Sequence, residues 1–343
     1  MTTEQGTAHR RVTLKDVAAR AGVATSTVSK VMNGRHDVGP EVRQRVLDTV
    51  QELGFHPNSV ARGLRMQRSD TIAIITDDLE GIFTNAMMRG VEDAASDAGV
   101  GVLLCNSYGD AQRESLQLQR LLDKQVDALI FMSGNRVGER PEPALPPSSQ
   151  VPYVYLYEYG LSDVPSVLPD DAGGAAAAAR HLVDSGAGRI AFLNGPLGWE
   201  ATEDRYAGFT TELTRLGREL DPDLYARTGS WNPEDGYSMM KSFLGRRPDI
   251  DAVFCGSDDL ATGVMAAVYD AGRSIPSDVQ VVGFDDRSLA IHQRPPLTTV
   301  ALPLAEMGRI AGKAALDLVL GEDPGFSRLR VPCTLVARGT THS

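Results

Sequence analysis

The sequence predicts an α/β protein with two doubly wound parallel-sheet subdomains, preceded by a small all-α helix-turn-helix head and a hinge helix. Three observations predict this fold. A compact pair of short amphipathic helices lies near the start, buried strands alternate with helices after Thr71, and this alternation occurs in two successive series. A chain of 343 residues is also longer than one ordinary core, so two or three domains are expected.

The head begins with the stretch LKDVAARAGVATSTVSKVMN, which has the period of two short helices broken at Gly22. Thr13 is placed to cap the first helix, with Asp16 giving the reciprocal bond. Val28 and Val31 form the inner stripe of the second helix. Its outer face carries short polar and cationic side chains, which suit base edges and phosphates: Thr25, Ser26, Ser29 and Lys30.

The charge distribution also distinguishes a basic head from an acidic body. Residues 1–68 hold 11 Lys and Arg against 6 Asp and Glu, whereas the rest of the chain holds 23 against 39. A balance of +5 in the head and −16 in the body indicates a nucleic-acid-binding head on an acidic body. The simpler alternative, a small helical domain solvated by its basic residues, is disfavoured by the helix-turn-helix pattern.

A third helix is predicted from Pro40, ending at Gly54. The basic segment after Pro57 is too short for an isolated helix, so it is a linker or a helix that forms only against a partner. We therefore expect a DNA-binding head at 1–57 and a hinge at 58–68. An effector-binding and dimerisation domain follows at 69–343. Its first subdomain is predicted at about 69–168 plus 299–323, and its second at about 169–298 plus 324–339.

In open parallel sheets, ligands bind outside the carboxyl ends of the strands. A cleft between two such sheets is the default small-molecule site. Other classes of site lack support. The sequence has no P-loop, no nucleophile elbow and no complete dinucleotide fingerprint, and its three isolated cysteines suggest neither disulfides nor zinc. We expect no catalytic residue, no cofactor and no metal. The lack of an apolar span and of a signal segment predicts a cytoplasmic protein.

Five segments resemble the lactose-repressor family of bacterial transcription regulators, and they occur in the family's order along nearly the whole chain. They are VTLKDVAARAGVATSTVSKVMNG, VRQRVLDTVQELGFHPNSVARGLR, DRYAGF, VVGFDD and PPLTTV. The resemblance implies a body similar to periplasmic sugar-binding proteins, operator DNA as a partner, and a small effector in the cleft. The chain has no C-terminal leucine-heptad tail, so we expect a homodimer.

The resemblance also assigns DNA-binding positions. The recognition-helix residues Thr25, Ser26, Ser29 and Lys30 match base- and backbone-reading positions. Thr13 and Asn33 match phosphate-contacting positions, with helix capping as the alternative role. Ala61 and Leu64 match the hinge residues that enter the minor groove, where leucine acts as a wedge between base steps. The alternative for Leu64 is packing on the body.

Within the cleft, Arg205 matches an arginine that clamps effector hydroxyls or carboxylates, and Asp285 matches an acidic hydroxyl-binder. The alternative is a structural ion pair. Phe83 matches an aromatic that packs on the ligand and Trp231 is a second candidate, with core packing as the competing role for both. The family often has Asn-Asp where this chain has Ser257 and Asp258, and Asp where it has Tyr157. These departures allow an effector larger or more apolar than a simple hexose.

We therefore predict a sequence-specific transcription regulator, and specifically a repressor. Its operator affinity is set by a sugar-like or related polyol effector through allosteric coupling. Two alternatives stay open. One is a cytoplasmic small-molecule-binding protein whose head serves assembly, and the other is an α/β enzyme.

Overall fold

The computed structural model describes residues 12–32, 34–35, 37–55, 68–133, 145–146, 149–158 and 164–342. The chain separates into two compact units, Met1–Ser69 and Asp70–Ser343. None of the helices in these described ranges is both long and apolar enough to cross a lipid bilayer.

The head unit contains three helices, α1 (Leu14–Ala21), α2 (Thr25–Met32) and α3 (Pro40–Glu52). Its core is a small apolar cluster centred on Val17, Val28 and Val46, each fully buried. Thr13 caps α1 in the predicted capping box, and Gly22 ends the helix at φ +66°, a conformation that glycine adopts without strain. The break between the first two helices is therefore fixed by local chemistry.

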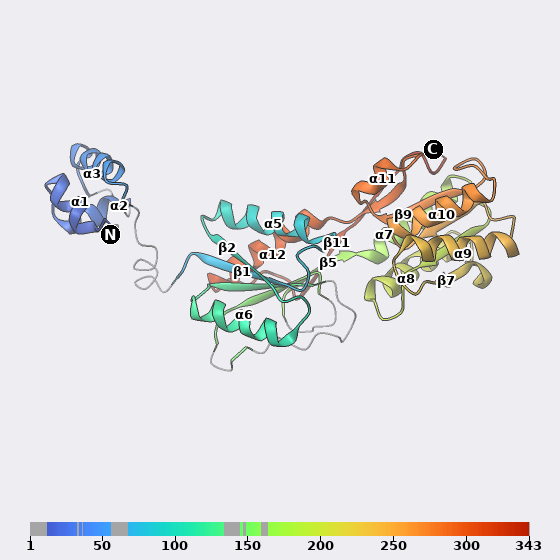
Figure 1. Ribbon diagram of the computed structural model, residues 1–343, viewed down its shortest axis with the longest axis horizontal. Helices are drawn as coiled ribbons and strands as arrows, with labels where there is room; N and C mark the ends of the chain where they lie inside the picture. The colour runs from blue at the N-terminus through green and yellow to red at the C-terminus, as the bar shows by residue number, and fades with distance from the viewer. Residues whose placement is uncertain are drawn as a thin grey trace, which may run out of the picture. The chain divides into compact units, whose positions relative to one another are not determined.

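The second unit contains two six-stranded sheets (Figure 1). The first sheet has the order β11-β5-β4-β3-β1-β2 and is parallel throughout. Its strands are β1 (Thr71–Thr76), β2 (Gly101–Asn106), β3 (Ala128–Met132), β4 (Tyr153–Leu156), β5 (Ser166–Asp170) and β11 (Arg328–Pro332). Helices α5 (Thr84–Asp97) and α12 (Leu304–Val319) pack on one face, and α6 (Ala111–Asp123) packs on the other (Figure 1).

The second sheet has the order β12-β10-β9-β8-β6-β7, with only β12 antiparallel. Its strands are β6 (Ile190–Asn194), β7 (Tyr225–Arg227), β8 (Ala252–Cys255), β9 (Gln280–Asp285), β10 (Thr298–Ala301) and β12 (Thr334–Val336). Helices α7 (Asp171–Asp184) and α8 (Glu200–Arg215) cover one face, and α9 (Pro233–Arg246) and α10 (Asp258–Asp270) cover the other. A short 3-10 helix (Pro222–Leu224) and α11 (Ser288–His292) complete the unit.

The predicted class, an α/β body of two doubly wound sheets behind a helix-turn-helix head, is confirmed. The subdomain boundaries differ from the prediction in two segments. Strand β10 pairs with β9 in the second sheet, and β11 pairs with β5 in the first. The physical reason is that α12 packs on the first sheet, so the strand after it adds to the nearest open edge, beside β5. The chain therefore crosses between the subdomains three times.

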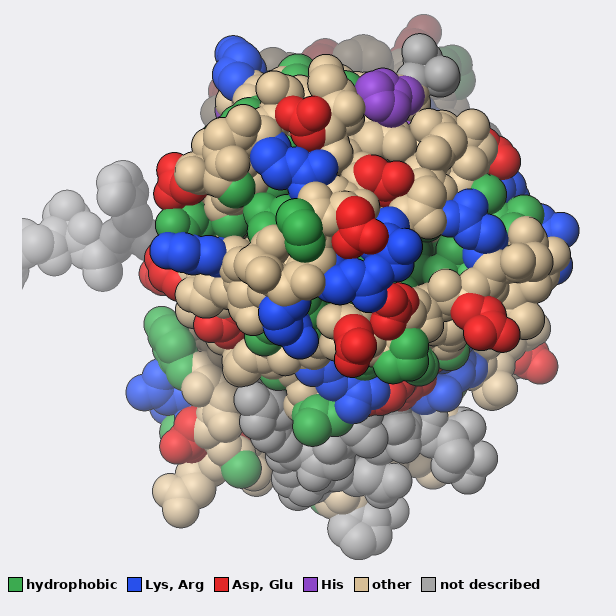
Figure 2. Space-filling view, turned by 90° about the vertical axis from the view of Figure 1, so that its right-hand side faces the viewer, with side chains coloured by type: hydrophobic (Ala, Val, Ile, Leu, Met, Phe, Trp, Pro, Cys, Tyr) green, Lys and Arg blue, Asp and Glu red, His purple; other side chains and the backbone are tan. Residues whose placement is uncertain are grey.

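The surface of the second subdomain carries charges of both signs. Figure 2 shows Lys and Arg side chains interspersed with Asp and Glu across this face. Several are paired, including Arg189 with Asp249 at 2.6 Å and Arg247 with Asp221 at 2.8 Å. A mixed surface of this kind lacks the single-sign field with which proteins attract the phosphate backbone of DNA.

Candidate functional site

The recognition helix α2 presents the predicted polar side chains on one outward face. Thr25, Ser26 and Lys30 are exposed and Ser29 is partly exposed, whereas Val28 and Val31 are buried beneath them. This arrangement places short hydrogen-bonding groups and one ammonium on the side away from the core. Asn33, Ala61 and Leu64 lie outside the described residues.

Two head residues already have partners within the protein. The backbone N–H and the hydroxyl of Thr13 donate to an Asp16 carboxylate oxygen at 2.8 and 2.7 Å, so its capping role is present. The Lys30 ammonium donates to Asp37 at 2.6 Å, and both side chains are about half exposed. This hydrogen bond lowers the pKa of Asp37. A contact between Lys30 and a base or phosphate would require the ammonium to release Asp37.

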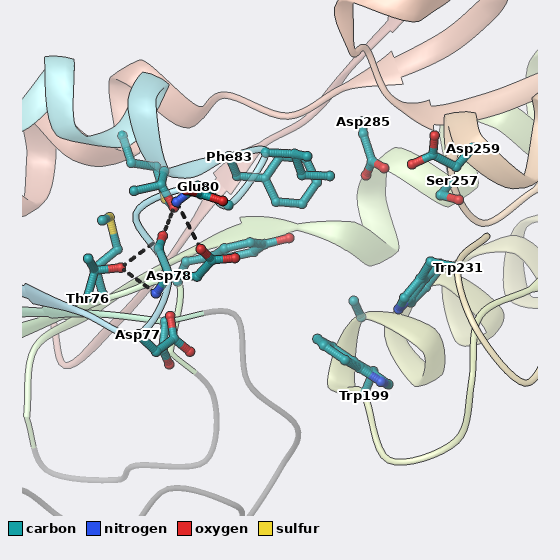
Figure 3. Close-up of a pocket in the computed structure, with 18 of the residues that line it drawn as sticks. Thr76, Asp77, Asp78, Glu80, Phe83, Trp199, Trp231, Ser257, Asp259 and Asp285 are labelled. Atoms are coloured by element: carbon teal, nitrogen blue, oxygen red, sulfur yellow. Dashed lines mark hydrogen bonds between the residues drawn. The ribbon is translucent and has the colours of Figure 1, made fainter. Parts of the chain in front are cut away.

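The second unit holds a cavity of about 440 Å³ between its two sheets, a volume typical of small-molecule sites. Residues from both subdomains face one another across it (Figure 3). Its lining comprises Thr76, Asp77, Asp78, Glu80, Gly81, Ile82, Phe83, Thr84, Met87, Met132, Ser133, Tyr157, Trp199, Ala201, Arg205, Trp231, Ser257, Asp259 and Asp285.

The sheet topology explains why these residues meet. In the first sheet the order of the strands along the chain reverses direction between β1 and β3. In the second sheet it reverses between β6 and β8. Crevices form at the carboxyl ends of the strands beside such points. The cavity is lined by residues at or after the ends of β1, β3 and β4 in one sheet and of β6, β7, β8 and β9 in the other.

Arg205 lies at the centre of the second subdomain's wall and is only 3% exposed. Its Nε donates to Asp171 at 2.7 Å, one terminal nitrogen donates to the Gly256 carbonyl, and the other lies 3.5 Å from Asp285. Its guanidinium also stacks on Phe284 at 3.8 Å. Burial opposes its charge, but Asp171 and Asp285 outweigh this effect and the pKa of Arg205 is raised. The predicted clamp is thus also a structural ion pair.

Asp285 is a buried acidic group of the lining. It is 7% exposed, and its Oδ1 lies 3.5 Å from the Arg205 guanidinium and accepts no hydrogen bond among the described residues. Burial raises the pKa of Asp285 well above its ordinary value, against the opposing effect of Arg205. Its φ is +106°, and that of Tyr157 is +59°, so two predicted contact residues adopt a backbone conformation that non-glycine residues rarely use. Strain of this kind is concentrated at binding sites, where it fixes a side chain's direction.

The aromatic candidates line the cavity rather than the core alone. Phe83 contacts the Tyr157 ring edge-on at 5.8 Å, and Trp231 contacts Trp199 edge-on at 6.3 Å. Burial, and next the negative charge of Asp171, raise the pKa of Tyr157. The bare backbone of Gly195 makes room for Trp231, because a Cβ there would lie 2.0 Å from the indole ring.

Of the two predicted contacts at the N-terminal end of α10, Ser257 lines the cavity and Asp258 does not. Ser257 lines the cavity, but its hydroxyl oxygen caps the helix by accepting from Leu260 N at 3.2 Å. Asp258 does not line the cavity. It is fully buried, and accepts from Thr299 Oγ1 at 2.5 Å and from Arg287 N at 2.7 Å. Its neighbour Asp259 faces the cavity instead and pairs with Arg287.

Several lining residues were absent from the sequence-based candidates. The main group is the acidic segment Asp77–Glu80, directly after β1, and Trp199 follows β6. Both positions carry a usable signal, because each lies just past the carboxyl end of a buried strand, where ligands bind. Among the described residues, no group of three or more His, Cys, Asp or Glu is arranged to hold a metal ion.

Ion pairs join the two subdomains beside the cavity. Arg330 on β11 contacts Asp204 at 2.5 Å and Glu200 at 3.0 Å, both on α8. Arg205 lies on the same helix. A change in the angle between the subdomains therefore moves α8 relative to β11 and alters this bridge.

A helix-turn-helix head with an outward polar recognition helix, joined to a two-sheet body with a ligand-sized cavity, defines the class of DNA-binding transcription regulators. The model of bacterial regulatory proteins of the lacI family matches residues 13–58, and the model of the periplasmic binding protein-like domain matches 179–341. The chain is 34% identical to catabolite control protein A of Priestia megaterium, over 96% of this chain and 99% of that protein.

Two solved structures are similar over nearly the whole chain. A lac repressor dimer bound to operator and the anti-inducer ONPF aligns with a TM-score of 0.79 and 27% identity, covering 97% of this chain and 100% of that one. A complex of the transcriptional regulator CelR with cellobiose aligns with a TM-score of 0.69 and 32% identity, covering 96% and 100%. The chain belongs to the lacI family of bacterial regulatory proteins, and it is a DNA-binding transcription regulator.

Proposed function

We propose that this regulator is a homodimeric repressor whose affinity for operator DNA is controlled by a sugar-like effector in the cavity between the two sheets. One observation carries the effector proposal. Asp285 lines the cavity, and its Oδ1 accepts no hydrogen bond among the described residues and lies 3.5 Å from a guanidinium already held in place by Asp171. A ligand hydroxyl donates to such a carboxylate in a charge-assisted hydrogen bond.

The cleft geometry supports coupling between ligand and DNA. An effector that contacts both subdomains stabilises one angle between them. Where DNA binding also prefers one angle, effector and DNA change each other's affinity by the same factor. Two relatives support the choice of ligand and partner, since the CelR structure contains cellobiose and the lac repressor dimer is bound to operator. Because the relatives are regulators, we propose a role in binding and not in catalysis.

DNA contact is proposed for the head and hinge, at residues 1–57 and 58–68, through the recognition face of α2 together with Thr13, Asn33, Ala61 and Leu64. Effector contact is proposed for Phe83, Tyr157, Arg205, Trp231, Ser257 and Asp285. Asp259 replaces Asp258 in this set, because Asp259 lines the cavity.

The test uses the full chain in two stages. Operator sequences are selected from a randomised duplex pool, and a near-palindromic site bound by two heads is expected. A sugar panel is then screened by intrinsic fluorescence, since the only two tryptophans of the sequence, Trp199 and Trp231, both line the cavity. At least one sugar should change both fluorescence and operator affinity. Failure to enrich any site, or sugars that bind without altering DNA affinity, would contradict the proposal.

A further inference from the structure

The cavity has a strong imbalance of charge. Among the described residues that line it, five carry a carboxylate and one carries a cation: Asp77, Asp78, Glu80, Asp259 and Asp285 against Arg205. Such a lining attracts donors and cations and repels anions.

The positive charge of Arg205 is already balanced by carboxylates of the protein. Arg205 is held by Asp171 at 2.7 Å and lies 3.5 Å from Asp285, so two carboxylates surround a single guanidinium. A phosphate or carboxylate on the effector would have to displace one of them in a buried setting, which is costly. The Asp285 carboxylate already faces this guanidinium, and as an acceptor it favours a ligand donor over another anion.

The segment after β1 adds negative charge on the facing wall. Asp78 and Glu80 are exposed to the cavity mouth, and neither forms an ion pair with any Lys or Arg that the structure describes. Hydrogen bonds that involve the backbone hold this segment in place. Glu80 N donates to Asp78 Oδ1 at 2.9 Å, and Thr84 Oγ1 donates to the Asp78 carbonyl at 2.8 Å. Figure 3 shows this segment on the opposite side of the cavity from Asp285 and Trp231.

The tryptophans complete the recognition surface. Trp199 and Trp231 stand edge-to-face at 6.3 Å across from the acidic segment (Figure 3). Indole faces bind apolar ring surfaces and also attract cations. The lining therefore combines hydroxyl acceptors, aromatic faces and unpaired negative charge within one cavity.

We infer that the effector is a cationic amino sugar, with hydroxyls on Asp285 and an ammonium group toward Asp78 and Glu80. This inference rests on the proposed function, that the cavity binds a sugar-like effector. Because Asp78 and Glu80 are exposed, each charge contact is worth little, and the two together favour the amine by roughly tenfold at low salt. Salt should reduce this preference, since exposed charges are screened.

The test compares sugars of matched shape by tryptophan quenching at pH 6, at low and at high salt. The probes are glucosamine and its β-1,4-linked dimer, glucose and cellobiose, and glucuronate. We expect the amino sugars to bind about tenfold more tightly than their neutral counterparts at low salt, with glucuronate weakest. The preference should shrink severalfold at high salt.

Two variants with the same change of net charge locate the effect. In the double variant Asp78→Asn, Glu80→Gln the ratio of amino-sugar to neutral-sugar affinity should fall to about twofold or less. The control double variant Asp93→Asn, Asp97→Asn alters exposed carboxylates on α5 that do not line the cavity, and should keep the preference. Neutral sugars that bind as tightly as amino sugars, or a preference that survives in the first variant, would overturn this inference alone. If no sugar of either kind quenches fluorescence or alters operator binding, the proposed function also fails.

Discussion

Replacing Asp285 with asparagine separates effector binding from folding. Burial raises the pKa of Asp285, so folding makes its carboxyl group easier to protonate than it is in the unfolded chain. For a carboxyl group this sign means that stability falls as pH rises from the unfolded-state pKa toward the folded one. The carboxylate therefore costs stability at neutral pH, and Asp285→Asn should unfold at the same temperature as wild type or higher.

Effector affinity, in contrast to stability, should fall in Asp285→Asn. A hydrogen bond to a charged acceptor contributes about 1.5–3 kcal/mol, whereas a neutral one contributes about 1 kcal/mol. Losing the charge on this carboxylate should thus weaken effector binding by about 1–2 kcal/mol, or roughly 5- to 30-fold. Operator affinity without effector should be unchanged, because the head carries the proposed DNA contacts.

The assay combines thermal unfolding at pH 7 with titration of tryptophan fluorescence by a sugar that binds the wild type. Asp171→Asn is the contrast, because Asp171 holds the same Arg205 at 2.7 Å but does not line the cavity. That variant should lose about 1–3 kcal/mol of stability, since the buried guanidinium loses its charged partner. If Asp285→Asn unfolds at a clearly lower temperature, or binds the sugar as well as wild type, Asp285 is a structural ion-pair residue.

Three further predictions concern other parts of the molecule. Lys30→Ala should lose about 1–3 kcal/mol of operator binding in a DNA titration, with a smaller loss on random duplex. Equal losses would make Lys30 a phosphate contact. Gly195→Ala should displace the Trp231 ring, whose nearest atom lies 2.0 Å from the added carbon, and so shift the emission spectrum and weaken sugar binding. An unchanged spectrum would contradict this role. Burial raises the pKa of Asp258 to about 7, so its contribution to stability falls as pH rises from about 4 to 7. Asp258→Asn should flatten the slope of unfolding free energy over that window, and an unaltered slope would rule out Asp258 as its source.

The head was predictable because its determinants are local. The capping box of Thr13 and Asp16, the glycine break and the buried pair Val28 and Val31 all follow from spacings of a few residues. These features were predicted and are confirmed. The alternation of strands and helices likewise predicted the class of the body.

The details that failed depend on non-local packing. Adjacent residues on a helix point about 100° apart, so the sequence alone did not decide which of Asp258 and Asp259 faces the cavity. The sheet assignments of β10 and β11 depend on where α12 packs, which no local pattern specifies. The sequence also did not show that Arg205 forms a buried ion pair in addition to lining the cavity. That ion pair depends on where the fold places Asp171, which is distant in the chain.

The central claim is that occupancy of the cavity sets operator affinity. Its most direct test measures the dissociation constant of a labelled operator by fluorescence anisotropy, with and without a saturating sugar that quenches Trp199 and Trp231. The dissociation constant of the wild type should change by at least about fivefold, in the range typical of allosteric coupling. An identical dissociation constant with the cavity empty and saturated would show that the cavity does not control operator binding.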